Sequence, residues 1–103
     1  MYKEQIDAYM DGQKERMIED LKTLIRIDSQ RTEAKPGMPY GEGAAAVLKA
    51  GLELMEKAGL QTKNYENYVI TGDLYPEKEK QLDILAHLDV VPVSEDWTVT
   101  APF

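Results

Sequence analysis

Apolar residues recur at helical spacing at the start of the chain, from about Tyr2 to Asp28. They follow mostly three- and four-residue steps and alternate with charged residues, which is typical of an amphipathic helix. The apolar positions are Ile6, Met10, Met17, Leu21, Leu24 and Ile25. This pattern predicts one long helix, or two helices joined near Gly12, with the apolar stripe packed in the core.

A second helical pattern runs from about Glu42 to Ala58 and is the clearest in the sequence. Its apolar face repeats through Ala44, Val47, Leu48, Gly51, Leu52 and Met55. Gly51 lies on this face, so its missing side chain predicts close packing onto a sheet. Gly59 fits the left-handed position just past a helix end. Residues 28–43, which lie between the two helices, are rich in glycine and proline and predict a loop.

After Leu60 the pattern changes to short runs of β-branched and aromatic residues, which favour strands. We expect two strands, in Thr62 to Asn64 and in Tyr68 to Tyr75, with a bend between them. A third strand, Gln81 to Leu88, is expected from a mostly apolar run that ends before Pro92, because proline cannot donate to a sheet. The sequence therefore predicts an α/β fold, with two helices packed on a small mixed sheet of about three strands.

Composition narrows the class of protein. A length of 103 residues suits one small domain, and 43% hydrophobic with 30% charged residues is the balance of a soluble globular protein. The 12 basic and 19 acidic residues give a net charge of −7, which argues against nucleic acid or an anionic membrane as a partner. The absence of cysteine excludes disulfides and thiolate metal sites. The charged N-terminus is no signal peptide and no apolar run is long enough to span a membrane, so we expect a cytoplasmic protein.

The single histidine, His87, lies near the end of the third expected strand, and Asp89 follows two residues later. Alternation along a strand would place both side chains on one face. A carboxylate beside a histidine can hold the ring and raise its basicity as a metal ligand. Taken alone this spacing is a weak signal, because a histidine at a strand end is more often an ordinary polar residue.

The longer string around this pair resembles a known family. His87-Leu-Asp89-Val-Val-Pro92, followed by Trp97 and Pro102-Phe103, resembles the zinc-dependent peptidases that include dipeptidases, carnosinases, aminoacylases, acetylornithine deacetylases and succinyl-diaminopimelate desuccinylases. The bacterial dipeptidase branch is the most similar, although Ala86 stands where that branch usually has glycine. The stretch Pro39-Tyr40-Gly41-Glu42-Gly43 also resembles the segment that precedes the second helix in that branch.

The resemblance implies a site and its chemistry. Family members carry two zinc ions bridged by a carboxylate and a water, with a glutamate as general base. By motif match His87 is a zinc ligand, and Asp89 is the active-site aspartate that steadies it. The other ligands of the family fall beyond Phe103, so we expect residues 1–103 to be an N-terminal part of a catalytic domain, truncated at its C-terminal end. The parent is then a zinc-dependent dipeptidase acting on dipeptides or short peptides, whereas this chain alone is inactive, with weak or absent zinc binding.

Two other interpretations stay open. The chain can be a self-standing, non-catalytic interaction or oligomerisation domain derived from such a peptidase, or the His87-x-Asp89 spacing can be incidental in an unrelated small α/β fold. For a fragment we expect a homo-oligomer joined through the sheet edge or residues 90–103. The reason is that the apolar run Leu82 to Leu88 would be buried on both faces in a whole domain and exposed in a part of it.

Overall fold

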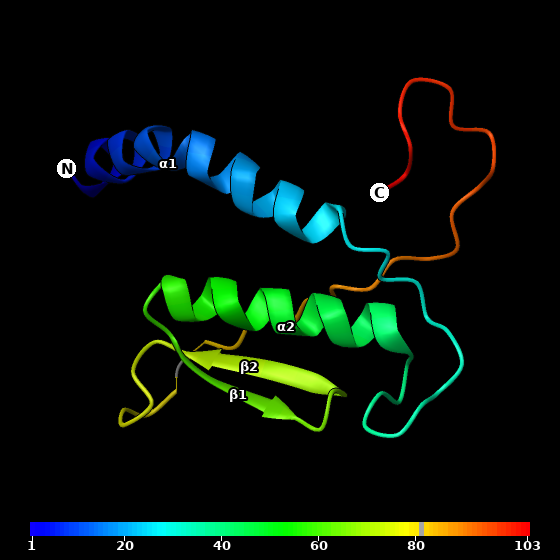
Figure 1. Cartoon of the computed structure of the whole chain (residues 1–103). Helices are drawn as coiled ribbons and strands as arrows, with labels where there is room; N and C mark the ends of the chain where they lie inside the picture. Colours follow the sequence, from blue (N-terminus) through cyan, green and yellow to red (C-terminus); the bar gives the residue numbers. More distant parts are fainter. Residues whose placement is uncertain (81) are drawn as a thin grey trace.

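The computed structural model describes residues 1–80 and 82–103. These residues form helix α1 (Tyr2–Ile25), helix α2 (Glu42–Lys57) and a hairpin of strands β1 (Gln61–Tyr65) and β2 (Val69–Asp73). Helix α2 packs on the hairpin, and α1 lies on the other side of α2 (Figure 1). The α/β class expected from the sequence is confirmed, with an antiparallel two-stranded sheet in place of a mixed sheet of about three strands.

Helix α1 is continuous through Gly12, so the first pattern forms one long helix. Its apolar stripe does not enter the core. All residues of α1 are described and none is buried, and Ile6, Met17 and Leu21 are 59%, 54% and 55% exposed. The expectation of a buried stripe is wrong because α1 contacts only α2 among the described elements, and much of its length projects past that helix (Figure 1).

Helix α2 supplies the buried residues at the centre of the fold, namely Ala44, Val47 and Gly51. A Cβ atom placed on Gly51 would lie 2.7 Å from Leu88 Cδ1 and 3.3 Å from Ile70 Cδ1. The glycine thus allows both β2 and the later part of the chain to approach the helix, as expected from its place on the apolar face. In the described part of the chain, neither helix combines the length and apolar character needed to span a bilayer.

The C-terminal end of α2 is closed by Gly59, which has φ of 88°. Its N–H donates to the carbonyl of Glu56 at 2.9 Å, and the N–H of Leu60 donates to the carbonyl of Met55 at 3.0 Å. These two hydrogen bonds form a Schellman motif, which satisfies carbonyl groups left open at a helix end. The sequence expectation for Gly59 is therefore confirmed.

The hairpin turn also follows the sequence expectation. Strands β1 and β2 pair in a register that sets Tyr65 opposite Val69. Between them, Glu66 and Asn67 have φ of 56° and 61°, and Tyr68 N–H donates to the Tyr65 carbonyl at 3.0 Å. Two central residues at positive φ are the signature of a type I′ turn, whose twist matches that of paired strands. Asn67 tolerates this conformation better than most residues.

The third expected strand is not formed. Residues 82–88 have no regular structure, and Gln81 lies outside the described residues. Leu82, Ile84 and Leu85 are 79%, 85% and 91% exposed. A strand requires a hydrogen-bonded neighbour, and among the described residues no strand pairs with this segment, so apolar character alone does not produce one.

Candidate functional site

His87 and Asp89 contact each other locally, in a segment without regular structure. The ring atom His87 Nδ1 lies 2.9 Å from the backbone carbonyl oxygen of Asp89 and 3.3 Å from its carboxylate Oδ1. Both oxygens can only accept from an imidazole, so the neutral ring carries its proton on Nδ1 and keeps its lone pair on Nε2. This tautomer presents a nitrogen that can bind a metal ion.

The contact arises differently from the way the sequence suggested. Strand alternation would set the two side chains on one face, but no strand is present at residues 82–88. Instead the chain turns so that the backbone of Asp89 itself reaches the ring, with the carboxylate beside it. The His87 side chain is 84% exposed, so the pair lies at the surface and not in an enclosed cavity.

Two anchors hold the segment that carries the pair. Between the two residues, Leu88 is half-buried and lies against Gly51 of α2. After the pair, Val90 forms a parallel bridge with Gln30 in the loop that follows α1, and the Gln30 side chain accepts a hydrogen bond from Val93 N–H at 3.2 Å. Gln30 could not be predicted from the sequence, because a single polar residue in a loop has no periodicity or spacing that indicates its partner.

The described residues do not complete a zinc site by themselves. Across residues 1–80 and 82–103, no group of three or more His, Cys, Asp or Glu side chains is placed to hold a metal ion. Catalytic zinc usually has three protein ligands and an open position. His87 offers one free ring nitrogen, and Asp89 is already directed to the other nitrogen of the same ring. This geometry matches one ligand with its supporting carboxylate, and no more.

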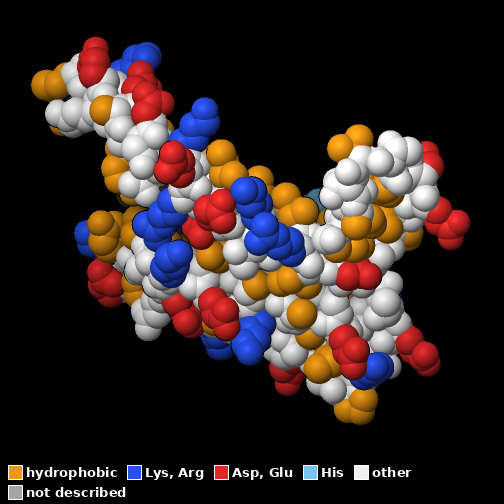
Figure 2. Space-filling model, turned by 45° about the horizontal axis from the view of Figure 1, so that its top comes forward, with side chains coloured by type: hydrophobic (Ala, Val, Ile, Leu, Met, Phe, Trp, Pro, Cys, Tyr) orange, Lys and Arg blue, Asp and Glu red, His pale blue; other side chains and the backbone are white. Residues whose placement is uncertain are grey.

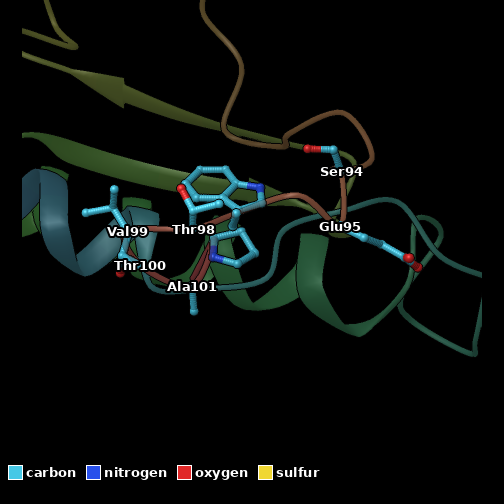
Figure 3. A pocket seen from close by; sticks show the side chains of 8 residues that line it. Ser94, Glu95, Thr98, Val99, Thr100 and Ala101 are labelled. Carbon is cyan, nitrogen blue, oxygen red and sulfur yellow. The ribbon is translucent and has the colours of Figure 1, made fainter.

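Two hollows lie away from this pair. The first, of about 550 Å³, is lined only by residues of the C-terminal segment. Figure 3 shows Ser94 and Glu95 at one side of it and Val99 and Thr100 at the other. Beside it, a hydrogen bond from the Ser94 hydroxyl, together with backbone hydrogen bonding, lowers the pKa of the Asp96 carboxyl. This hollow contains neither member of the His87 and Asp89 pair.

The second hollow, of about 880 Å³, lies between the loop after α1 and the hairpin turn. Its lining residues are Ala34, Lys35, Gly37, Pro39, Asn64, Glu66, Asn67 and Tyr68. Asn67 closes one end by donating a hydrogen bond from Nδ2 to the Gly37 carbonyl at 2.8 Å. Lys35 is paired with Glu42 at 2.8 Å. The Asn67 contact joins the loop to the hairpin turn and the Lys35 contact joins it to the start of α2, so we assign this hollow a structural role.

Comparison with known proteins places the chain among bacterial peptidases. It is 41% identical over 88 residues to "Putative dipeptidase YtjP" of Bacillus subtilis (strain 168), a match that covers 82% of this chain and 19% of the relative. It is 32% identical over 90 residues to "Beta-Ala-Xaa dipeptidase" of Lactobacillus delbrueckii subsp. lactis, covering 85% and 19%. With "Putative dipeptidase SAUSA300_1697" of Staphylococcus aureus (strain USA300) it shares 34% over 100 residues, covering 94% and 20%.

Neither a family model nor a solved structure matches the chain. The sequence relatives nevertheless agree with one another in name, and the similarity extends over most of the 103 residues. The chain spans about a fifth of the length of these relatives. The resemblance seen in the motifs is thus confirmed: the chain is a homologue of the bacterial dipeptidases and corresponds to about one fifth of such a protein.

Proposed function

We propose that this chain is part of a zinc-dependent dipeptidase that hydrolyses dipeptides or short peptides in the cytoplasm. The observation that carries the proposal is the His87 ring, held through Nδ1 by Asp89 so that Nε2 is free, in a chain homologous to dipeptidases. The peptide substrate class follows from the names of these relatives, one of which specifies Beta-Ala-Xaa substrates.

Each residue of the pair has a defined part in this proposal. His87 supplies one ligand through Nε2, and Asp89 fixes the ring and favours the tautomer that can bind. Bound zinc would supply a Lewis acid that polarises the peptide carbonyl and activates a water molecule. The described residues bring no group of three or more potential ligands together, and we propose that the rest of a longer polypeptide supplies the further ligands.

The proposal predicts that the 103-residue chain alone is inactive and binds zinc weakly or not at all. One imidazole, with a carboxylate beside the same ring, cannot fill the tetrahedral coordination shell of zinc. Isothermal titration of the purified chain with zinc at neutral pH tests this, with His87→Ala as the control for nonspecific uptake by surface carboxylates. Tight stoichiometric binding by the chain, lost in His87→Ala, would show that the site is complete here and that the assignment of one ligand is wrong.

The longer enzyme tests the activity itself. A full-length protein that contains this chain should hydrolyse a dipeptide, lose that activity when a chelator removes the metal, and regain it when zinc is restored. Activity that is indifferent to the chelator would contradict a metal-dependent mechanism.

Self-association is a second proposed property, and a specific observation favours it. Apolar side chains that a larger domain would cover are exposed here, including Leu82, Ile84, Leu85 and Val91 at 79%, 85%, 91% and 80%. Figure 2 shows hydrophobic side chains exposed both on the projecting helix and on the C-terminal segment. Exposed apolar surface favours association, so we propose that two or more copies of the chain cover it for one another.

A further inference from the structure

Gln30 joins the loop after α1 to the segment that carries His87 and Asp89. Its side-chain Oε1 accepts a hydrogen bond from Val93 N–H at 3.2 Å, between residues 63 positions apart in the sequence. Its backbone forms a parallel bridge with Val90. In Figure 1 the loop that follows α1 meets the later segment at this point. Both contacts lie directly after Asp89, so they fix the chain immediately beyond the pair.

Asp28 determines how the Gln30 amide is oriented. Its carboxylate Oδ1 accepts from Gln30 Nε2 at 2.8 Å and from Gln30 N–H at 3.3 Å. A carboxylate can only accept and a peptide N–H can only donate, so one orientation of the amide serves both Asp28 and Val93. If the amide were reversed, its oxygen would face the Asp28 carboxylate and its NH2 group would face the Val93 N–H, and neither pair could form a hydrogen bond. The arrangement therefore uses the donor and the acceptor of a single glutamine.

The loop under Gln30 is held firmly against α2. Ser29 is only 1% exposed. The carbonyl oxygen of Asp28 lies 1.9 Å from where a Cβ atom on Gly43 would be, so the first turn of α2 rests directly on this peptide group. The backbone next to Gln30 is thus packed against α2, and the Gln30 side chain extends from it toward Val93. Together with Leu88 on Gly51, it encloses Asp89 between two points of attachment, and His87 directly precedes the first of them.

We propose that Gln30, oriented by Asp28, is a positioning residue that sets where the His87 ring is presented. The ring itself is 84% exposed, and among the described residues its hydrogen bond is to Asp89, so its place depends on the backbone that carries it. Gln30 does not touch the ring and acts through the backbone of residues 90–93. The role of His87 as a metal ligand rests on the proposed function, whereas the arrangement that positions it does not.

The test uses nuclear magnetic resonance on the 15N-labelled chain, in which His87 is the only histidine and gives one set of ring signals. Gln30→Met keeps the length of the side chain and removes both hydrogen-bonding groups. We expect the Val93 amide to exchange with solvent about two- to tenfold faster, the effect of losing one hydrogen bond. The ring 15N shifts should also move away from the Nδ1–H tautomer. Gln5→Met on the exposed face of α1 is the matched control and should change neither signal.

A charge-swapped pair separates positioning from a loss of folding. Gln30→Glu alone sets two carboxylates together and should release Val93. Adding Asp28→Asn introduces a donor at position 28, where the unmodified chain has only an acceptor. The new carboxylate at position 30 can then accept from this amide and from Val93 N–H, so both signals should return toward those of the unmodified chain. If the effect of a substitution at position 30 came only from the size of the side chain, a change at position 28 would not reverse it.

Three results would overturn the proposal: unchanged Val93 exchange in Gln30→Met, faster exchange with an unchanged His87 ring, or no recovery in the double variant. None of these readouts involves zinc or peptidase activity. The proposed function can therefore fail while the positioning by Gln30 stands, and the reverse also holds.

Discussion

The same substitution, glycine to alanine, should have opposite effects at two helical positions of this chain. Gly12 lies within α1, and a Cβ atom placed there meets nothing within 4 Å. Gly43 lies in the first turn of α2, where the added atom would stand 1.9 Å from the backbone carbonyl oxygen of Asp28. Alanine is favoured over glycine within a helix by about 1 kcal/mol, so the difference between the sites comes from their surroundings.

The loss of stability expected for Gly43→Ala follows from the overlap between the added Cβ atom and the Asp28 carbonyl oxygen. Cβ atoms in real structures essentially never approach closer than 3.0 Å, so the loop at Asp28 must move away from α2 by roughly 1 Å. The obstacle is backbone and not the end of a flexible side chain. Overpacking of this kind costs about 1–3 kcal/mol or more, which outweighs the helical preference of alanine. We expect Gly43→Ala to lower the free energy of unfolding by about 1–3 kcal/mol and Gly12→Ala to raise it by about 0.5–1 kcal/mol.

Thermal unfolding followed by far-ultraviolet circular dichroism measures both changes. For a chain of this length about 1 kcal/mol corresponds to about 4–8 °C in Tm. Gly43→Ala should melt several degrees below the unmodified chain and Gly12→Ala slightly above it. If Gly43→Ala melts at or above the Tm of the unmodified chain, α2 does not contact the loop at Asp28 as closely as described. The placement of Gln30 depends on the same contact.

Three other predictions concern the pair, an ion pair and the association of the chain. In the full-length enzyme Asp89→Asn should lower activity or metal affinity about 10–100-fold, the usual effect of removing a carboxylate that supports a ligand; kinetics at varied zinc concentration measure it, and unchanged values would remove Asp89 from the site. The hydrogen bond from Lys35 lowers the pKa of Glu42 below its ordinary value of 4.5, so its stabilising contribution is present above that value and is lost as the pH falls through the lowered pKa. Glu42→Gln should therefore reduce the acid-induced loss of stability in urea unfolding at pH 3–5, and an identical pH profile would contradict the pairing. Sedimentation at micromolar concentration should show a dimer or larger species, and a stable folded monomer would contradict self-association through the exposed apolar surface.

Local patterns in the sequence predicted local structure well. The apolar repeat of α2, the left-handed Gly59 after it and the bend between the strands all depend on neighbouring residues, and the structure contains each of them. The close packing predicted at Gly51 is also present, although one of its two neighbours is Leu88 from outside the sheet.

Features that depend on distant partners were not predicted. The stripe of α1 has the periodicity of a core helix, but burial needs a second surface, and α1 has only α2 beside it in the described chain. The apolar run at residues 82–88 has strand composition without a strand to pair with. The contact between Gln30 and Val93 joins residues 63 positions apart, and the sequence around either residue does not predict it. For the candidate site, the motif predicted the roles of His87 and Asp89, which stay a prediction, while the structure shows the atoms through which the two residues meet.

The central claim is that His87 supplies a zinc ligand of a dipeptidase, and hydrolysis of a dipeptide by the full-length protein tests it most directly. The unmodified enzyme, His87→Ala and the surface control Gln5→Met should be compared at saturating zinc. We predict that His87→Ala loses most of the activity, because no other histidine of residues 1–103 can replace it, and that Gln5→Met keeps its activity. Near-normal hydrolysis by His87→Ala would contradict the claim.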